Sequence, residues 1–327
     1  MTKNDLRHII GATVVAALLV SVFVVAFAWP AANLRPRDVP IGVAGPAPFV
    51  AQVEQRLSAA QPGGFEITAY ENPAAARDAI KAREIYGAIV AGQPPTVLTA
   101  PAGSAAVAQA LEGIAAGING VTPVPTEQVV PLPAEDPRGI GFSAGALPMV
   151  LGALLTGIIS FLLLATVGAR LTALTTGSIA AALVAAALLG PWLGILPGAY
   201  VETSAAIALG FFAGGAMVVG WASLIGPPGI GVAAVLLMVL GNPLSGAPSA
   251  PELLPTGWGA LGQWLPPGAL TSLLRSVAYF DGAGGARPAA ILAAWAVLGV
   301  TLAALGARRA KASPEPLRPP QQPAPTH

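Results

Sequence analysis

The segment Ala144–Leu240 constrains the fold more than any other part of the chain, because it consists almost entirely of Ala, Leu, Val, Ile and Gly. Within it only Arg170 and Glu202 carry charge. A helix on the surface of a soluble protein needs a polar face, and this segment has no room for one. Since one membrane-spanning helix takes about 20 apolar residues, the segment predicts about four spans.

The composition of the whole chain favours the same class. Hydrophobic residues make up 54% and charged residues only 9%, whereas a soluble domain carries about 25% charged residues. The formal net charge of +1 indicates no basic patch, so we expect no nucleic-acid partner. The chain has no cysteine, which excludes disulfides and zinc–thiolate sites.

Six membrane-spanning helices are predicted, with about five of them in the C-terminal half. They are Ile9–Trp29, Ala144–Val167, Thr175–Leu196, Tyr200–Leu224, the shorter Ile230–Leu240 and Ala289–Leu305. Gly168 and Arg170 are expected in the turn between the second and third. The first span has a competing interpretation, since Ala26-Phe27-Ala28 matches a signal-peptidase site. Its apolar run exceeds the roughly 7–15 residues of a signal peptide, which favours an uncleaved anchor.

Residues 31–143 differ in composition and predict a water-soluble α/β domain, because charged residues concentrate there and strand and helix patterns alternate. The predicted strands are Pro40–Val43, Phe65–Tyr70, Tyr86–Val90 and Pro95–Leu98, and the predicted helices are Phe49–Ala59, Pro73–Arg83 and Ser104–Ile118. Asn72 and Ser104 are expected to cap the last two helices. The Pro-rich segment Val121–Pro133 is expected to be an extended linker back to the membrane.

The orientation follows from the basic residues near the spans, which collect on the cytoplasmic side. Lys3, Arg7, Arg170, Arg308 and Arg309 all fall on one side if six spans cross the membrane. Residues 1–30 then form a short cytoplasmic segment and the first span. Residues 31–143 are extracytoplasmic, residues 144–307 form a five-helix membrane domain with an outer loop at 241–288, and residues 308–327 form a disordered cytoplasmic tail. The Ala, Gly and Pro content favours a bacterial plasma membrane.

The motifs for catalysis are weak. Gly141-Phe142-Ser143-Ala144-Gly145 matches the nucleophile elbow, but both histidines, His8 and His327, are predicted on the opposite side, so a small-residue helix entry is favoured. The sequence has neither a Walker A loop nor an H-E-x-x-H motif. We therefore expect no enzyme activity, catalytic residue, cofactor or metal site, and any ATPase must be a separate polypeptide.

Two groups of residues are candidates for function or packing. The outer loop gathers polar and aromatic residues near the membrane surface, namely Asn242, Ser245, Glu252, Trp264, Arg275 and Asp281. Arg275 is expected to snorkel to the interface; the alternatives are pairing with Glu252 or Asp281, or contact with a lipid phosphate. In the fourth span, Gly210 and Gly214 have the GxxxG spacing that lets helices approach closely. The predicted bundle has little internal polar lining, which disfavours an ion channel or a proton-coupled carrier because these place ionisable residues within the bilayer.

Several stretches together resemble the type-2 ABC exporter permeases, closest to their phage-infection-protein (YhgE/Pip-like) branch. They are Asp38–Val43, Ala74–Ile80, Ile85–Val90, Gly241–Gly246, Pro251–Pro255, Leu265–Gly268 and Leu274-Arg275. The resemblance implies a permease subunit that acts as a homodimer or heterodimer with a separate ATPase. The apolar bundle favours a hydrophobic or amphipathic substrate such as a lipid, a drug or an envelope component.

Two alternatives stay open. The chain could be a membrane scaffold whose external domain binds an envelope protein or lipid, and the short cytoplasmic loops favour this alternative. The second alternative is a membrane-embedded hydrolase that uses Ser143.

Overall fold

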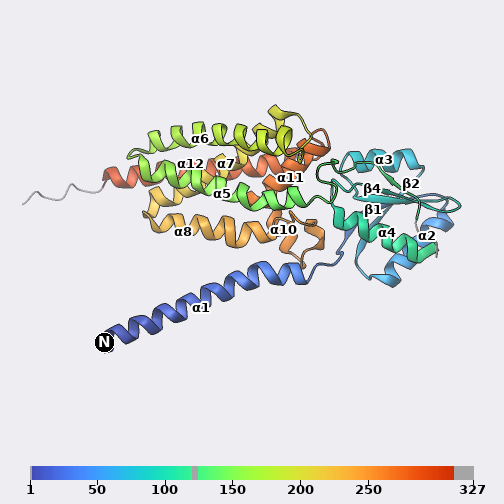
Figure 1. Ribbon diagram of the computed structural model, residues 1–327, viewed down its shortest axis with the longest axis horizontal. Coiled ribbons are helices and arrows are strands. Elements are labelled where there is room, and N and C mark those ends of the chain that lie inside the picture. Colours follow the sequence, from blue (N-terminus) through green and yellow to red (C-terminus); the bar gives the residue numbers. More distant parts are fainter. Residues whose placement is uncertain (1, 120–123, 313–327) are drawn as a thin grey trace, which may run out of the picture.

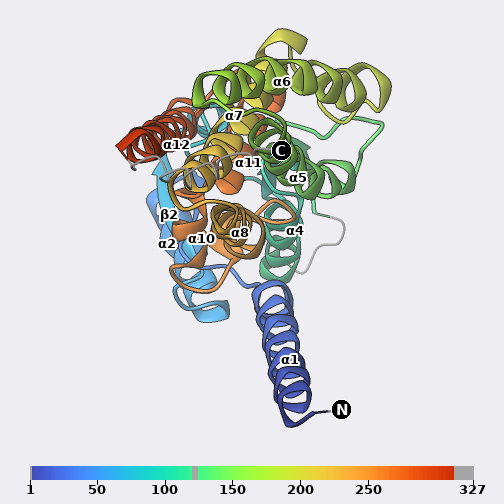
Figure 2. The ribbon, with the colours of Figure 1, turned by 90° about the vertical axis from the view of Figure 1, so that its left-hand side faces the viewer.

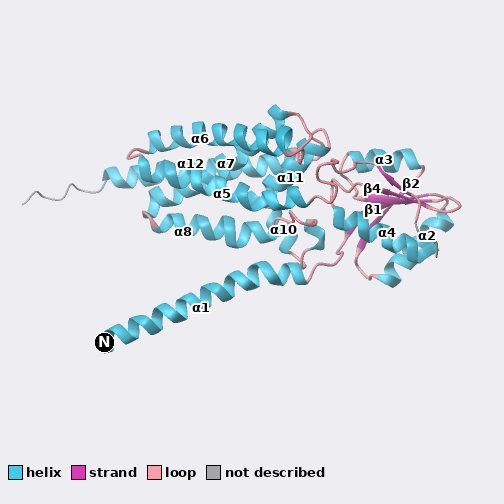
Figure 3. Ribbon diagram, in the orientation of Figure 1, coloured by secondary structure: helices cyan, strands magenta, loops and turns pink. Residues whose placement is uncertain are grey.

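The fold is taken from a computed structural model that describes residues 2–119 and 124–312 (Figure 1). A block of long helices makes up most of the molecule, and a small α/β domain sits at one end of it. Figure 3 shows that the strands are confined to this domain. The N-terminal end of helix α1 (Lys3–Ala32) and the C-terminal end of helix α12 (Ala286–Ala312) both lie at the opposite end of the molecule (Figure 1).

Five helices in the described part of the chain are long and apolar enough to cross a membrane, as in a multi-pass membrane protein. They are α1, α5 (Ile140–Leu163), α6 (Val167–Ala187, extended to Trp192 by the π-helical turn η1), α7 (Tyr200–Ile225) and α12. The predicted span at Ile230–Leu240 lies in a shorter apolar helix, Pro228–Leu244. That helix consists of α8 (Pro228–Ala234), the π-helical segment η2 (Val235–Gly241) and α9 (Asn242–Leu244).

Some predicted boundaries are wrong. Gly168 and Arg170 lie in the first turn of α6 and not in the preceding turn, because Thr166 caps the helix and its Oγ1 accepts a hydrogen bond from the Ala169 amide at 3.3 Å. Helix α5 begins at Ile140, before the predicted start at Ala144. Residues 308–312, predicted as disordered tail, continue α12. The rest of the predicted tail, 313–327, lies outside the described residues.

Helix α7 is the centre of the block (Figure 2) and packs against α5, α6, α8, α11 (Pro266–Tyr279) and α12. In its most apolar stretch 72% of the residues are buried, against 6% for α1, which stands apart from the bundle and packs against α9 and η2. Gly210 and Gly214 are both buried, but they face different helices. A Cβ on Gly210 would lie 2.6 Å from the Leu270 side chain of α11, and one on Gly214 would lie 2.8 Å from Cβ of Ala153 on α5.

The α/β domain contains a five-stranded sheet in the order β2-β1-β3-β4-β5, with β3 and β4 antiparallel and the other neighbours parallel. The strands are β1 (Val39–Ala44), β2 (Phe65–Tyr70), β3 (Gly87–Val90), β4 (Thr96–Thr99) and β5 (Thr126–Gln128). Helices α2 (Ala47–Ala60) and α4 (Ala105–Asn119) cover one face, and α3 (Pro73–Lys81) covers the other (Figure 1). Strand β5 corrects the predicted linker Val121–Pro133; residues 121–123 of that linker lie outside the described residues.

The predicted outer loop, 241–288, is largely helical and ties the two parts together. It contains α9, the 3-10 turn η3 (Pro251–Leu253), α10 (Trp258–Gln263), α11 and the start of α12. Ala250 and Leu253 share a hydrophobic cluster with Val39 and Ile41 of the sheet. Phe280 packs into the cluster on the other face of the same sheet. The loop therefore holds the α/β domain on both faces.

Candidate functional site

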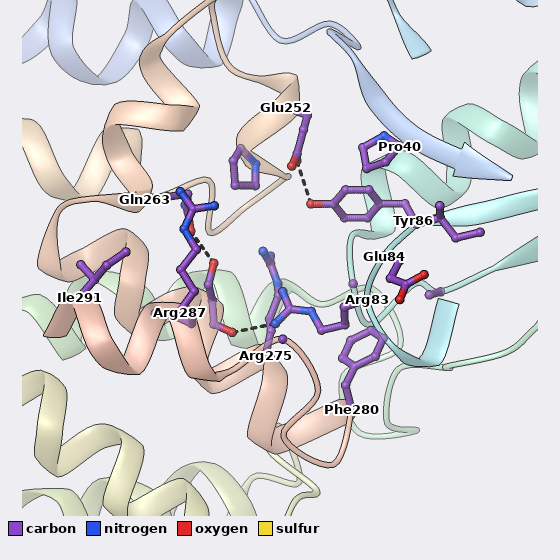
Figure 4. A pocket seen from close by; sticks show the side chains of 17 residues that line it. Pro40, Arg83, Glu84, Tyr86, Glu252, Gln263, Arg275, Phe280, Arg287 and Ile291 are labelled. Atoms are coloured by element: carbon purple, nitrogen blue, oxygen red, sulfur yellow. Dashed lines mark hydrogen bonds between the residues drawn. The ribbon is translucent and has the colours of Figure 1, made fainter. Parts of the chain in front are cut away.

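A cavity of about 230 Å³ lies where the α/β domain meets the helical block (Figure 4). Side chains from the α3–β3 turn, from η3, and from α11 and α12 line it. Three arginines (Arg83, Arg275 and Arg287) and two glutamates (Glu84 and Glu252) lie in this lining, which therefore carries one net positive formal charge.

Arg83 reaches from the α/β domain to α11. Its backbone has a φ of 62°, in the left-handed region that a residue other than glycine rarely adopts. Its Nη1 donates hydrogen bonds to the Ser272 carbonyl at 3.0 Å and to the Ser276 hydroxyl, and its guanidinium lies 5.3 Å from the Phe280 ring centre. Burial lowers the pKa of Arg83. These contacts hold a strained residue in place, as is common at functional sites.

Arg275 is buried beneath the cavity, with 7% of its surface exposed. Its Nη2 donates a hydrogen bond to the Ala247 carbonyl at 2.7 Å, and its guanidinium lies 4.9 Å from the Phe142 ring centre. Burial lowers the pKa of Arg275 to about 10, which leaves it charged at neutral pH. The snorkelling prediction is therefore wrong.

No carboxylate pairs directly with Arg275 in the described part of the chain. Arg77 on α3, by contrast, forms an ion pair with Glu127 of the sheet. Asp281, a predicted partner, is exposed and does not line the cavity. Its backbone is left-handed, with a φ of 49°, in the turn after α11. The buried charge of Arg275 is thus met by neutral acceptors and an aromatic ring.

Tyr86 and Glu252 form a second link between the two parts of the molecule. The Tyr86 hydroxyl donates to Oε2 of Glu252 at 2.8 Å (Figure 4). Burial and the adjacent Glu252 carboxylate raise the pKa of Tyr86 well above its usual range. Below this pair, Arg37 Nη1 donates to the Leu253 and Leu254 carbonyls at 2.9 and 2.8 Å. Tyr86 therefore holds the Glu252 carboxylate, and Arg37 holds the backbone that follows Glu252.

The remaining wall faces α10 and α12. Arg287, in the first turn of α12, is exposed and lies 5.5 Å from the ring centre of Trp264, which is itself 57% exposed. Gln263 accepts a hydrogen bond from the Ser272 hydroxyl at 2.5 Å and donates one to the Ser245 carbonyl at 3.1 Å. Arg287 and the start of α12 thus border the open side of the cavity.

The structure brings together only part of the predicted site. Glu252 and Arg275 line the cavity, and Trp264 lies at its edge. Asn242 and Ser245 lie at α9, where they line a neighbouring cavity instead. Sequence reasoning missed Arg83, Tyr86 and Arg287. The available signal was that Arg83 and Tyr86 directly precede a buried strand, which places polar side chains at an edge of the sheet.

Two further cavities continue from the first in series, the second adjoining the first and the third adjoining the second. Arg275 also lines one of about 230 Å³ together with Tyr279 and Ser143. Ser143 and residues 247–249 in turn line a third, of about 210 Å³, that reaches Phe27 and Leu34 at the end of α1. Ser143 lies in the first turn of α5, where its hydroxyl donates to the Gly139 carbonyl at 3.0 Å. It does not lie on the strand-to-helix turn of a nucleophile elbow.

Comparison of the chain with protein-family models, with curated proteins and with solved structures gives no match. The resemblance to exporter permeases therefore stays a prediction. Within the described ranges, no group of three or more His, Cys, Asp or Glu side chains is placed to hold a metal ion. The chemistry that the arrangement supports is the binding of an anion by guanidinium groups.

Proposed function

We propose that this chain is the membrane permease subunit of an exporter for an anionic amphipathic molecule, such as a lipid or another envelope component. The observation that carries the proposal is the series of three adjoining cavities. It begins at the end of α1 and ends at the arginines below the α/β domain. One end of the series is apolar and the other positively charged, which matches the two ends of an amphipathic molecule.

The exposed position of α1 supports entry from the bilayer. Its apolar side chains are mostly exposed, so lipid would surround it. The third cavity lies between the C-terminal end of α1, the first turns of α5 and residues 242–249. An amphipathic molecule in the membrane could reach this cavity without crossing water.

The proposed topology has six crossings, with both termini in the cytoplasm of a bacterium and the α/β domain outside. The ends of α1 and α12 at one end of the molecule support an even number (Figure 1). The helix Pro228–Leu244 would be the additional crossing. At about 1.5 Å per residue it extends roughly 25 Å, close to the hydrocarbon thickness of about 30 Å.

A membrane scaffold without transport is the second candidate. Only Leu164–Thr166 separates α5 from α6, and Gly226-Pro227 separates α7 from α8. Turns this short offer little surface on which an ATPase could dock, and this observation favours the scaffold.

The two candidates separate in a purification experiment. The tagged full-length chain is extracted from its native host in mild detergent, and co-purifying proteins are quantified by mass spectrometry. A stoichiometric ATPase with a Walker A loop is the result expected for the permease. An enriched envelope protein without any ATPase would instead establish the scaffold.

A further inference from the structure

We infer that the cavity between Arg83, Arg275 and Arg287 binds a phosphate group with a single negative charge, of the kind that phospholipid headgroups carry. The inference deepens the proposed function and rests on it only for the route by which the ligand arrives. The binding site itself follows from the geometry of the cavity.

The charge of the cavity wall selects a monoanion. The three arginines and two glutamates leave one positive charge unmatched. The guanidinium of Arg275 is buried against neutral groups, and burying a charge without a counter-ion is costly. A phosphodiester carries one negative charge at neutral pH and would balance the wall. A dianion would leave a negative charge in excess, and a neutral polar group would leave the positive charge of the wall unbalanced.

The donors needed for such a group are available. Each guanidinium has five N–H donors in a planar fork. Within the described residues, the hydrogen bonds of Arg83 engage Nη1, and those of Arg275 engage Nη2. The other nitrogens of both forks stay available for phosphate oxygens, which arginine binds in a bidentate manner. Gly284 and Arg287 place the N-terminus of the long helix α12 at the same wall, and a helix N-terminus attracts anions.

The size and surroundings of the cavity indicate a headgroup and not a whole lipid. Its volume of about 230 Å³ is below the roughly 300–1,000 Å³ of ligand cavities that enclose drug-sized molecules. The exposed apolar side chain of Trp264 lies beside Arg287 at the edge of the cavity. Trp295 Nε1 donates to the Trp264 carbonyl at 2.7 Å and joins α12 to α10 there. Tryptophan and arginine are the residues that favour the membrane interface, where phosphates lie.

The test is a binding titration on the purified full-length chain in a neutral maltoside detergent, followed by microscale thermophoresis. The probe is the water-soluble lipid dihexanoylphosphatidylglycerol, with dihexanoylglycerol and inorganic phosphate as separate arms. We expect saturable binding of the phospholipid, weak binding of phosphate and none of dihexanoylglycerol. Arg287→Gln should weaken phospholipid binding at least tenfold, because it removes a charged donor. Its side chain is exposed, so the variant should fold.

Arg77→Gln is the matched control, because Arg77 lies on α3 outside the cavity. This variant should bind the phospholipid as tightly as the wild type does. Equal binding in both variants would overturn the inference, and so would equal binding of dihexanoylglycerol. Phosphate binding as tight as that of the lipid, with the same dependence on Arg287, would overturn the lipid source of the group. This titration and the ATPase purification test separate claims. Phospholipid binding without a co-purifying ATPase would contradict the exporter proposal and support this binding site. A co-purifying ATPase without phospholipid binding would contradict this binding site alone.

Discussion

Arg170 and Arg275 lie at opposite ends of the helical block, and both stack on a phenylalanine. Arg170 lies 4.1 Å from the Phe161 ring centre, and its Nε donates to the Leu164 carbonyl at 2.7 Å. Its Nη1 donates to Ser223 Oγ at 3.3 Å. Arg275 has similar contacts but borders two cavities.

The difference lies in what each guanidinium leaves open. Arg170 satisfies a carbonyl at the C-terminal end of α5, which is a favourable position for a cation, and joins α6 to α7. Arg275 lines a cavity together with Arg83 and Arg287. The same residue type therefore supports packing at one end and, in our account, ligand binding at the other.

The largest effect on folding should come from substitutions that disrupt close helix packing, and it should be similar at both ends of the helical block. A Cβ on Gly259 would lie 1.9 Å from the Pro251 carbonyl oxygen, and one on Gly306 would lie 2.2 Å from that of Ser223. Gly259→Leu and Gly306→Leu should each abolish monodisperse protein in size-exclusion chromatography. Gly231→Leu is the control, because nothing lies within 4 Å of its Cβ position. A folded Gly306→Leu protein would show that the far end is less closely packed than described.

Substitution of each arginine by glutamine should affect stability and phospholipid binding differently. Arg170→Gln should lower the free energy of unfolding by about 1.5–3 kcal/mol, the value of a hydrogen bond to a charged group. Phospholipid binding should stay within twofold of the wild type. Denaturant unfolding in detergent and thermophoresis measure the two quantities.

Arg275→Gln should show the opposite pattern. Removing its buried charge relieves a desolvation cost that offsets the lost hydrogen bond, so stability should change by less than about 1 kcal/mol. Phospholipid binding should fall at least tenfold. If binding fell more in Arg170→Gln than in Arg275→Gln, the assignment of roles to the two ends would be reversed.

Tyr86 gives the pocket end a pH dependence. Because its pKa is raised in the folded state, the stability from neutral Tyr86 is complete below the unfolded value of about 10 and is lost at higher pH. Tyr86→Phe should flatten this alkaline loss, and it should lower stability at pH 7 by about 1–3 kcal/mol because Glu252 loses its donor. Thermal unfolding between pH 7 and 11 measures both the alkaline slope and the loss at pH 7. An unchanged alkaline slope would contradict the hydrogen bond between the half-buried Tyr86 and Glu252. Burial also raises the pKa of Tyr279, so Tyr279→Phe should flatten the slope in the same direction.

The smallest effect is expected at Arg77, away from both ends. Its ion pair with Glu127 has side chains 36% and 44% exposed, and such surface pairs contribute less than about 1 kcal/mol. Arg77→Gln should therefore unfold within 1 kcal/mol of the wild type. A larger loss would mean that the edge strand β5 depends on this pair.

Local patterns predicted many elements of the fold. Phe65–Tyr70 is a strand as predicted, and Asn72 caps α3, with its Oδ1 accepting from the Ala75 amide at 2.9 Å. The predicted outer loop, 241–288, is largely helical for a local reason. A Pro-Pro pair inside a helix would break it, but Pro266 is the first residue of α11, a position that favours proline.

The candidate site was less predictable, because it depends on distant contacts. Glu252 and Arg275 are among the polar residues that the sequence predicts together in the outer loop. Tyr86 lies 166 residues from its partner Glu252 along the chain. Arg83 lies 193 residues from its partner Ser276. No local sequence pattern predicts these contacts, because they form only when the loop packs on both faces of the sheet.

The most direct test of the central claim is a cryo-electron microscopy structure of the full chain in nanodiscs that contain phosphatidylglycerol. The account predicts phosphate density between the guanidinium groups of Arg83, Arg275 and Arg287. The Arg287→Gln variant in the same nanodiscs should lose this density. A cavity closed by the two domains packing together, or density that persists unchanged in the variant, would contradict the claim that the arginines form a phosphate site.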